Sequence, residues 1–228
     1  HMQRIFAMDG KVVNFLNKVA DLVLLNILWL ICCVPIVTIG ASTTAFSYVL
    51  LKMVRDEESY LFSTFFRVFK ENFKQSTVVW VIFILIGAVL YLDFYVVGIM
   101  TGGVKSILLT LFFMILFLVA ATMFYVFPVM AFFENSTKKV FKNSFYMALA
   151  HLPYTLLIVV INLCPVILLI FGNFIAAGFV DAVIGFALAG WINAHIFRKL
   201  FDRYLKKTET AVSVEERNKE GSSYGSEI

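Results

Sequence analysis

The chain has 228 residues, of which 61% are apolar and 15% are charged, and its formal net charge is +4. A water-soluble domain with this composition and a mean hydropathy of +0.89 would expose large apolar patches, so the composition excludes the soluble classes. At about 20 residues per spanning helix, the length suits five or six membrane crossings in one domain.

The first apolar segment runs from residue 20 to residue 39, and we expect it to form the first crossing and to set the orientation of the chain. Pro35 disfavours a helical conformation at the residue before it, and Gly40 permits a sharp bend. Ser42, Thr43 and Thr44 are expected to cap a second helix over residues 41–54.

That second helix is short, because about 14 residues extend only about 21 Å, less than the roughly 30 Å hydrocarbon core. Either the link completes the crossing and residues 36–54 form the second arm of a hairpin, or this segment is re-entrant. The total length of the chain favours the hairpin. Basic residues on both flanks place the two ends of the pair in the cytoplasm: Arg4, Lys11 and Lys18 before it, and Lys52, Arg55, Arg67, Lys70 and Lys74 after it.

An aromatic stripe follows, in which the phenylalanines between residues 62 and 73 recur at helical spacing while the opposite face is polar and basic. This pattern is typical of an amphipathic helix that lies in the membrane interface. The alternative is that the stripe packs on the protein's own helices, and both contacts can coexist. Arg67, Lys70 and Lys74 on the basic face are candidate contacts with anionic inner-leaflet lipids or with a cytoplasmic partner.

Two further crossings are expected over residues 76–100 and 104–133, which are apolar and long enough to span the bilayer. The turn between them carries little charge and is expected outside, and Pro128 is expected to kink or end the second helix. Lysines in the segment 134–142 return the chain to the cytoplasm, where a second amphipathic piece runs to about residue 151.

Residues 152–171 and 174–196 predict a last hairpin, and residues 208–228 are polar and predict a disordered cytoplasmic tail. The predicted fold class is therefore all-α: a polytopic membrane helical bundle of about six transmembrane helices, arranged as three hairpins with amphipathic interfacial helices. Residues 1–207 would form a single transmembrane domain, and both termini would be cytoplasmic.

Motifs of catalysis are missing from the sequence. It contains no Walker A loop, no dinucleotide-binding glycine fingerprint, no HExxH and no paired-cysteine motif. We therefore predict no catalytic, cofactor-binding or metal-binding residues, and we expect that the protein is not an enzyme.

Asp181 lies within the last apolar segment, and an intramembrane carboxylate is by default a candidate functional group, although a structural pairing or water contact is the alternative. Gly178, Ala182, Gly185 and Ala189 fall on one face of the same helix and predict close packing against another helix. That helix belongs either to this chain or to another subunit.

The helix break itself is a further candidate site. Thr38, Gly40, Ser42, Thr43 and Thr44 surround a helix N-terminus that is expected at membrane depth. Broken helices of this kind expose backbone donors to a ligand in transporters. Alternatively, the hydroxyl groups satisfy the backbone groups that the break leaves free.

Three strings carry a family resemblance: LICCVPIVTIGASTTA at residues 30–45, YVLLKMVR at 48–55 and FKENFKQ at 69–75. Together they resemble the YesL family of bacterial membrane proteins, a family of unknown function with no catalytic or ligand residues to carry over. Its members are typical of Firmicutes and often accompany carbohydrate-uptake ABC transporters and glycan-degrading enzymes.

The resemblance implies a non-catalytic accessory subunit or assembly factor of a carbohydrate-uptake ABC transporter. The expected location is the bacterial cytoplasmic membrane, and the expected partners are the lipid bilayer, including anionic inner-leaflet lipids, and ABC permease subunits. No nucleic-acid partner or cofactor is expected, and a homo-oligomer remains open. The alternative is a stand-alone small-molecule transporter or channel, with the break at Thr38 to Thr44 and Asp181 lining the path.

Overall fold

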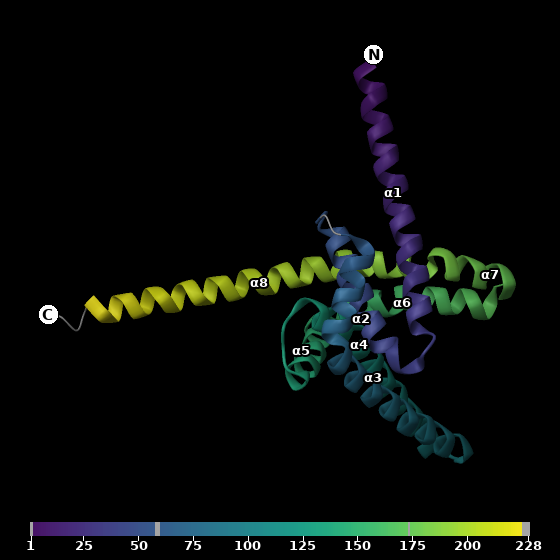
Figure 1. Cartoon of the computed structure of the whole chain (residues 1–228). Helices are drawn as coiled ribbons and strands as arrows, with labels where there is room; N and C mark the ends of the chain where they lie inside the picture. Colours follow the sequence, from purple (N-terminus) through teal and green to yellow (C-terminus); the bar gives the residue numbers. More distant parts are fainter. Residues whose placement is uncertain (1, 58–59, 173, 225–228) are drawn as a thin grey trace.

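The computed structural model describes residues 2–57, 60–172 and 174–224, and all regular structure in these residues is helical (Figure 1). Six of the described helices are long and apolar enough to cross a membrane. The predicted all-α membrane bundle is therefore confirmed. The candidate spans are Val12–Cys33, Ile36–Val54, Leu61–Ile99, Gly103–Phe132, Leu152–Phe171 and Gly178–Lys206.

The first hairpin consists of α1 (Met2–Cys33) and α2 (Ile39–Val54), joined by a 3-10 turn over Ile36–Thr38. The break predicted from Pro35 is confirmed, but α1 ends at Cys33 rather than at residue 39 because the proline acts on the residues before it. Together the turn and α2 provide a 19-residue candidate span, and this length favours the full hairpin over a re-entrant segment.

The predicted capping of α2 by residues 42–44 is wrong. The helix begins two residues earlier than expected, and its N-cap residue makes no side-chain hydrogen bond. Ser42 Oγ instead donates to the carbonyl oxygen of Trp29 at 3.1 Å, and Thr44 Oγ1 lies 2.9 Å from Ser76 Oγ. These hydroxyls join α2 to its neighbours because they already lie inside the first helical turns.

The segment 61–74, expected as a separate interfacial helix, is continuous with the third crossing in α3 (Leu61–Ile99). No Pro or Gly stands between residues 61 and 86, so nothing in the sequence ends the helix there. Its 39 residues extend about 58 Å, nearly twice the membrane core. The aromatic stripe is divided, since Phe65 is fully buried and Phe62 is 51% exposed, so packing and exposure coexist.

The next elements, α4 (Gly103–Phe132), α5 (Thr137–Ala150) and α6 (Leu152–Phe171), follow the prediction closely. Pro128 lies inside α4 without ending it. The predicted last crossing is instead divided into three pieces: α7 (Phe174–Val180), a π-helical turn η2 (Asp181–Gly185) and the start of α8 (Phe186–Tyr224).

Residues 208–224 continue α8 as a helix, where the sequence predicts a disordered tail. Glu, Lys and Arg are good helix formers, and extending an existing helix is far easier than starting one. Residues 225–228 of the predicted tail lie outside the described residues. The division into a membrane domain of residues 1–207 and a cytoplasmic tail stays a prediction.

Figure 1 shows how the hairpins are arranged. The turns near residues 34–38 and 100–102 lie toward the bottom and the lower right, and the end of α6 near residue 172 lies at the right; we call this side of the molecule the tip end. Both chain ends, the α2–α3 connection and α5 lie toward the top and left, at what we call the basic end. Among the described residues, Lys105 is the single basic residue near the hairpin turns, and its Nζ donates to Gly98 O.

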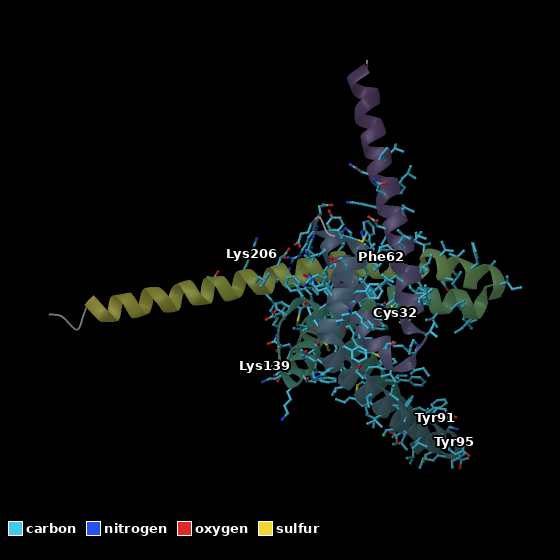
Figure 2. The ribbon with its side chains drawn as sticks, in the orientation of Figure 1. Cys32, Phe62, Tyr91, Tyr95, Lys139 and Lys206 are labelled. Carbon is cyan, nitrogen blue, oxygen red and sulfur yellow. The ribbon has the colours of Figure 1, made fainter. Side chains whose placement is uncertain are left out.

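The core surrounds α2, which packs against α3, α4 and α8. Residues are buried on several sides of α2, from Gly40 and Ala41 to Val54, as expected for a helix that is apolar around its circumference. Tyr125 of α4 and Phe201 of α8 are fully buried beside it. The shortest crossing is thus the central one, and longer helices pack against it; Figure 2 draws the side chains of these helices.

Candidate functional site

The helix break between α1 and α2 is closed by contacts within the chain. Thr38 Oγ1 donates to the carbonyl oxygen of Cys32 at 2.6 Å, and Trp29 Nε1 donates to Thr43 Oγ1 at 3.2 Å. With the bonds of Ser42 and Thr44 to neighbouring helices, all four hydroxyls of the break have partners. These contacts favour the second interpretation of the break, in which the hydroxyl groups satisfy backbone groups that the break leaves free.

Gly40 lies where α2 crosses α3 at close range. A Cβ atom at this position would lie 2.5 Å from the carbonyl oxygen of Ser76 and 2.9 Å from Trp80 Cβ. The first turn of α2 is therefore pressed against the backbone of α3, and no space for a ligand exists on this side of Gly40.

Asn26 of α1 is a residue that the sequence analysis missed. It is fully buried, and its Nδ2 donates to the carbonyl oxygens of Asp181 at 2.9 Å and Ala182 at 2.7 Å. Its Oδ1 accepts from the backbone N–H of Ala187 at 2.8 Å. A π-helical turn disturbs the regular helical hydrogen bonds, and Asn26 supplies partners for three backbone groups around it. The available signal was a lone amide within an apolar run.

Asp181 begins this π-helical turn and is 2% exposed. Among the described residues, its Oδ2 atom has no hydrogen-bond partner. Gly185 makes room for the carboxyl group, because a Cβ there would overlap Asp181 Oδ1. On the rest of the small-residue face, Ala189 is buried, Gly178 is half-buried near Leu169, and Ala182 is exposed.

A cavity of about 300 Å³ lies inside the bundle, and we call it the central cavity. Its walls come from α2, α4, α6 and α8, with Trp29 of α1 and Trp80 of α3 completing them. Most lining residues are aromatic or aliphatic, and no charged side chain lines it within the part of the chain that the structure describes. Its polar lining side chains are Thr43, Ser47, Asn162 and Asn193, together with the indole groups.

Ion pairs and aromatic rings join the helices at the basic end. Arg55, just after α2, lies 2.6 Å from Asp202 Oδ1 of α8, and its guanidinium lies over the ring of Phe132 at 4.5 Å. Arg198 of α8 donates to the carbonyl oxygen of Val54 at 2.7 Å. These contacts bind the C-terminal end of α2 to α8 and α4, so the basic end is built into the core.

Two titratable groups outside the spans have shifted pKa values. His151 Nε2 lies 3.1 Å from the hydroxyl of Tyr204, and burial, with a smaller contribution from the charge of Arg203, lowers the His151 pKa. Lys18 donates to Asp56 at 2.8 Å, and this hydrogen bond lowers the pKa of the Asp56 carboxyl. Both effects favour an uncharged His151 and an ionised Asp56 at neutral pH.

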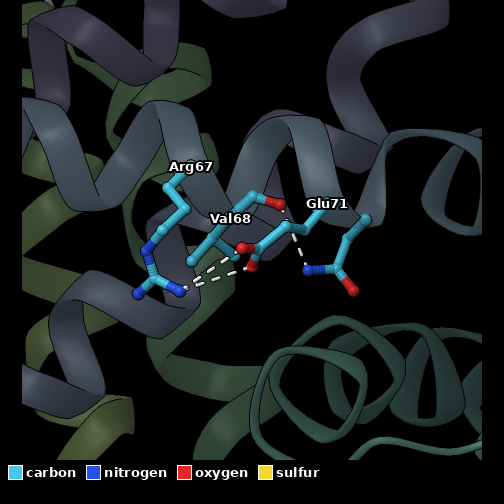
Figure 3. A network of polar contacts seen from close by, with 4 residues as sticks. Arg67, Val68 and Glu71 are labelled. Atoms are coloured by element: carbon cyan, nitrogen blue, oxygen red, sulfur yellow. Dashed lines mark hydrogen bonds and ion pairs between the residues drawn. The ribbon is translucent and has the colours of Figure 1, made fainter.

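The predicted basic residues Arg67, Lys70 and Lys74 are all exposed on α3. Arg67 lies 3.4 Å from Glu71 Oε2, one helical turn along, and Figure 3 shows this pair beside the Asn72 to Val68 hydrogen bond. Such an exposed pair contributes about 0.5 kcal/mol or less. The cluster is therefore a charged surface and adds little to the stability of the fold.

A second basic group lies on α5, where Lys138, Lys139 and Lys142 are exposed. Gln75 Nε2 donates to the carbonyl oxygen of Asn135 at 2.8 Å, which ties α3 to the connection that precedes α5. The two groups of basic residues therefore lie on joined elements of the basic end, and Figure 2 shows Lys139 pointing away from the bundle. We call them together the basic surface.

Among the described residues, no group of three or more His, Cys, Asp or Glu side chains could hold a metal ion. Cys32 and Cys33 are half-buried, Cys164 is exposed, and none of them forms a disulfide.

A family model described as "Protein of unknown function, DUF624" matches residues 22–94 of the chain. The match includes Asn26, the helix break, α2 and most of α3, and it contains the stretch 30–75 over which the sequence resembles the YesL family. No curated protein and no solved structure matches the chain.

Proposed function

We propose that the protein is a non-catalytic accessory subunit or assembly factor that binds partner proteins at the bacterial cytoplasmic membrane. The proposed partner is the permease of a carbohydrate-uptake ABC transporter, the class that the resemblance to the YesL family implies. The observation that carries the proposal is the basic surface, which is exposed at the same end as both termini. Such a surface suits an acidic protein face or anionic lipids.

The proposed orientation places the basic end and both termini in the cytoplasm. Lysine and arginine are enriched in cytoplasmic loops, and the described hairpin turns hold little basic charge. A permease and its cytoplasmic ATPase subunits would then meet the basic surface, and Ala182 and the surrounding exposed apolar residues would face lipid or a permease helix.

Reversing the charge of the basic surface on α3 is expected to weaken the complex. In the triple variant Arg67→Glu, Lys70→Glu and Lys74→Glu, recovery of permease subunits should fall at least about tenfold, because three attractive charges on the surface become repulsive toward an acidic partner. The measurement is affinity purification from the native host in mild detergent, at equal expression, with mass spectrometry of the retained proteins.

The matched control is Lys105→Glu, which changes the charge at the tip end and should leave recovery unchanged. Labelling of a cysteine introduced at Lys139 reports whether the triple variant keeps its orientation. Unchanged recovery of permease subunits in a correctly oriented triple variant would remove the basis of the proposal, as would recovery of the wild-type protein alone.

A second candidate function, stand-alone transport, is favoured by the unpartnered carboxyl oxygen of Asp181. π-Helical turns occur frequently at functional sites, and intramembrane carboxylates line ion and proton paths. Under this function, liposomes that contain only this protein would show flux of a sugar or an ion.

In such liposomes, Asp181→Asn should reduce the flux by about tenfold or more, because a residue that takes part in ion or proton passage loses its titratable group. The control is Asp93→Asn, an exposed acid near the tip end of α3, which should have no effect. Absence of flux from correctly inserted protein would exclude this function.

A further inference from the structure

The central cavity has walls from several helices and therefore exists only in the assembled bundle. Phe46 of α2, Phe127 of α4 and Phe197 of α8 form apolar parts of its lining, and Trp29 and Trp80 add the two indole rings. Its volume of about 300 Å³ is at the lower end of the range of about 300 to 1,000 Å³ that ligand pockets occupy.

Most polar groups around the cavity already have partners within the chain. Thr43 accepts from Trp29, Ser47 donates to the carbonyl oxygen of Thr43 at 2.8 Å, and Asn162 donates to that of Ile158 at 2.8 Å. Because these polar groups already have partners within the chain, a ligand in the cavity does not need to form hydrogen bonds with them.

Asn193 of α8 is the exception among the described lining residues. It is 5% exposed, and its Oδ1 atom has no hydrogen-bond partner. An unpaired amide oxygen inside a membrane bundle is costly, because no water is present to replace the missing partner. Buried polar atoms without a hydrogen-bond partner are rare in folded proteins. A ligand that supplies the missing hydrogen bond would remove this cost.

The lining also restricts the chemistry of that ligand. A charged molecule would find no opposite charge among the described lining residues, and burial of an unpaired charge is prohibitively costly. A sugar would bring many hydroxyl groups to a wall that offers few free polar atoms. A mainly apolar molecule with one polar group fits, since apolar surface with a few polar contacts is the usual composition of a small-molecule site.

We propose that the central cavity binds a neutral, mainly apolar molecule that carries one hydroxyl group, and that this hydroxyl bonds to Asn193. A hydroxyl both donates and accepts, so it satisfies the amide whichever of its two ends faces the cavity. Single-chain alcohols have this chemistry, and such molecules would enter from the bilayer. The site is separate from the basic surface and does not depend on the proposed partner.

The tryptophans provide a direct test. The chain has three, of which Trp29 and Trp80 line the cavity, whereas Trp191 does not line it and lies against the ring of His195 at 4.4 Å. In a Trp191→Phe background, both remaining indoles report on the cavity. A terminally brominated decanol quenches tryptophan on contact, and bromodecane serves as the matched probe without the hydroxyl.

Brominated decanol should quench the full chain in detergent saturably, and Asn193→Leu should weaken its binding about tenfold, because one hydrogen bond is lost. Bromodecane should bind the two proteins equally well. The reverse background, Trp29→Phe with Trp80→Phe, should show only the linear quenching that follows from partition into detergent. Equal affinity of the alcohol for both proteins, or quenching that never saturates, would overturn the proposal.

A second variant keeps the test decisive if Asn193→Leu does not fold. Ser47→Leu adds volume to the cavity wall, so it should weaken the binding of brominated decanol and bromodecane alike. Unchanged saturable quenching in folded Ser47→Leu would show that the probes bind elsewhere and would overturn the proposal. Loss of saturable quenching by both probes in folded Ser47→Leu would show that the probes bind in the central cavity.

Discussion

Replacing Asn26 by Leu is expected to lower the free energy of unfolding by about 3 kcal/mol. The buried amide makes three hydrogen bonds to backbone groups at the π-helical turn, at 2.7 to 2.9 Å. Leucine has a similar size but leaves the carbonyl oxygens of Asp181 and Ala182 and the N–H of Ala187 without partners. Each unsatisfied buried group costs about 1 to 3 kcal/mol, although local rearrangement lowers the sum.

The matched control is Asn72→Leu on α3, whose amide, among the described residues, donates to the carbonyl oxygen of Val68 in its own helix, at 3.1 Å. This change should cost less than about 1 kcal/mol, because the carbonyl keeps its helical bond. Unfolding in lipid bicelles, followed by thermal or denaturant titration, compares the two variants. Equal stabilities would show that the Asn26 network does not hold α1 to the last crossing.

The same contact explains why the π-helical turn could not be predicted. Asn26 and Asp181 are 155 residues apart in the sequence, and apolar patterning over residues 174–196 indicates a helix without showing its local register. The turn is stable where a polar partner satisfies the backbone groups it frees, and that partner is contributed by tertiary packing. Asp181 was identified as a candidate, but its neighbour was not.

Residue types alone predicted the helix boundaries where those residues act directly on the backbone. Pro35 ends α1, and the alternation of apolar and charged stretches places α5 and α6. The amphipathic pattern wrongly predicted that a separate helix precedes the third crossing in α3. A change from a basic face to an apolar run changes what a helix contacts, but it does not end the helix. The prediction that residues 42–44 cap α2 was wrong, because hydroxyl groups in the first turns of a helix also bond to adjacent helices, as Ser42 does to Trp29.

The central cavity and the unpaired amide oxygen of Asn193 could not be inferred from the sequence either. Asn193 is a polar residue in the mainly apolar first part of α8, and the sequence pattern is the same whether its side chain is paired or free. Asn26 and Asn193 show the two outcomes, since one has three partners and the Oδ1 of the other has none among the described residues. Packing of several helices decides between them.

A second large effect is expected at the crossing of α2 and α3, where Gly40→Ala should destabilise the protein by about 2 to 3 kcal/mol. The added Cβ would lie 2.5 Å from the backbone oxygen of Ser76 and 2.9 Å from Trp80 Cβ, distances at which atoms repel strongly. Backbone cannot move aside as a side-chain tip can, so α2 must shift away from α3 and weaken the core around it.

Alanine substitutions at two other glycines, which have different amounts of space around them, allow the stabilities of three variants to be compared. A Cβ at Gly190 would meet the flexible ends of Leu50 and Phe46, at 2.6 and 2.8 Å, so Gly190→Ala should cost less than Gly40→Ala. Gly87 has nothing within 4 Å, and Gly87→Ala should stabilise α3 by about 0.5 to 1 kcal/mol because alanine restricts the unfolded chain. The stability order Gly87→Ala, wild type, Gly190→Ala, Gly40→Ala, measured by unfolding in bicelles, would follow from close packing at α2. If Gly40→Ala were as stable as Gly87→Ala, α2 and α3 would not be in direct backbone contact, and the central position of α2 would be wrong.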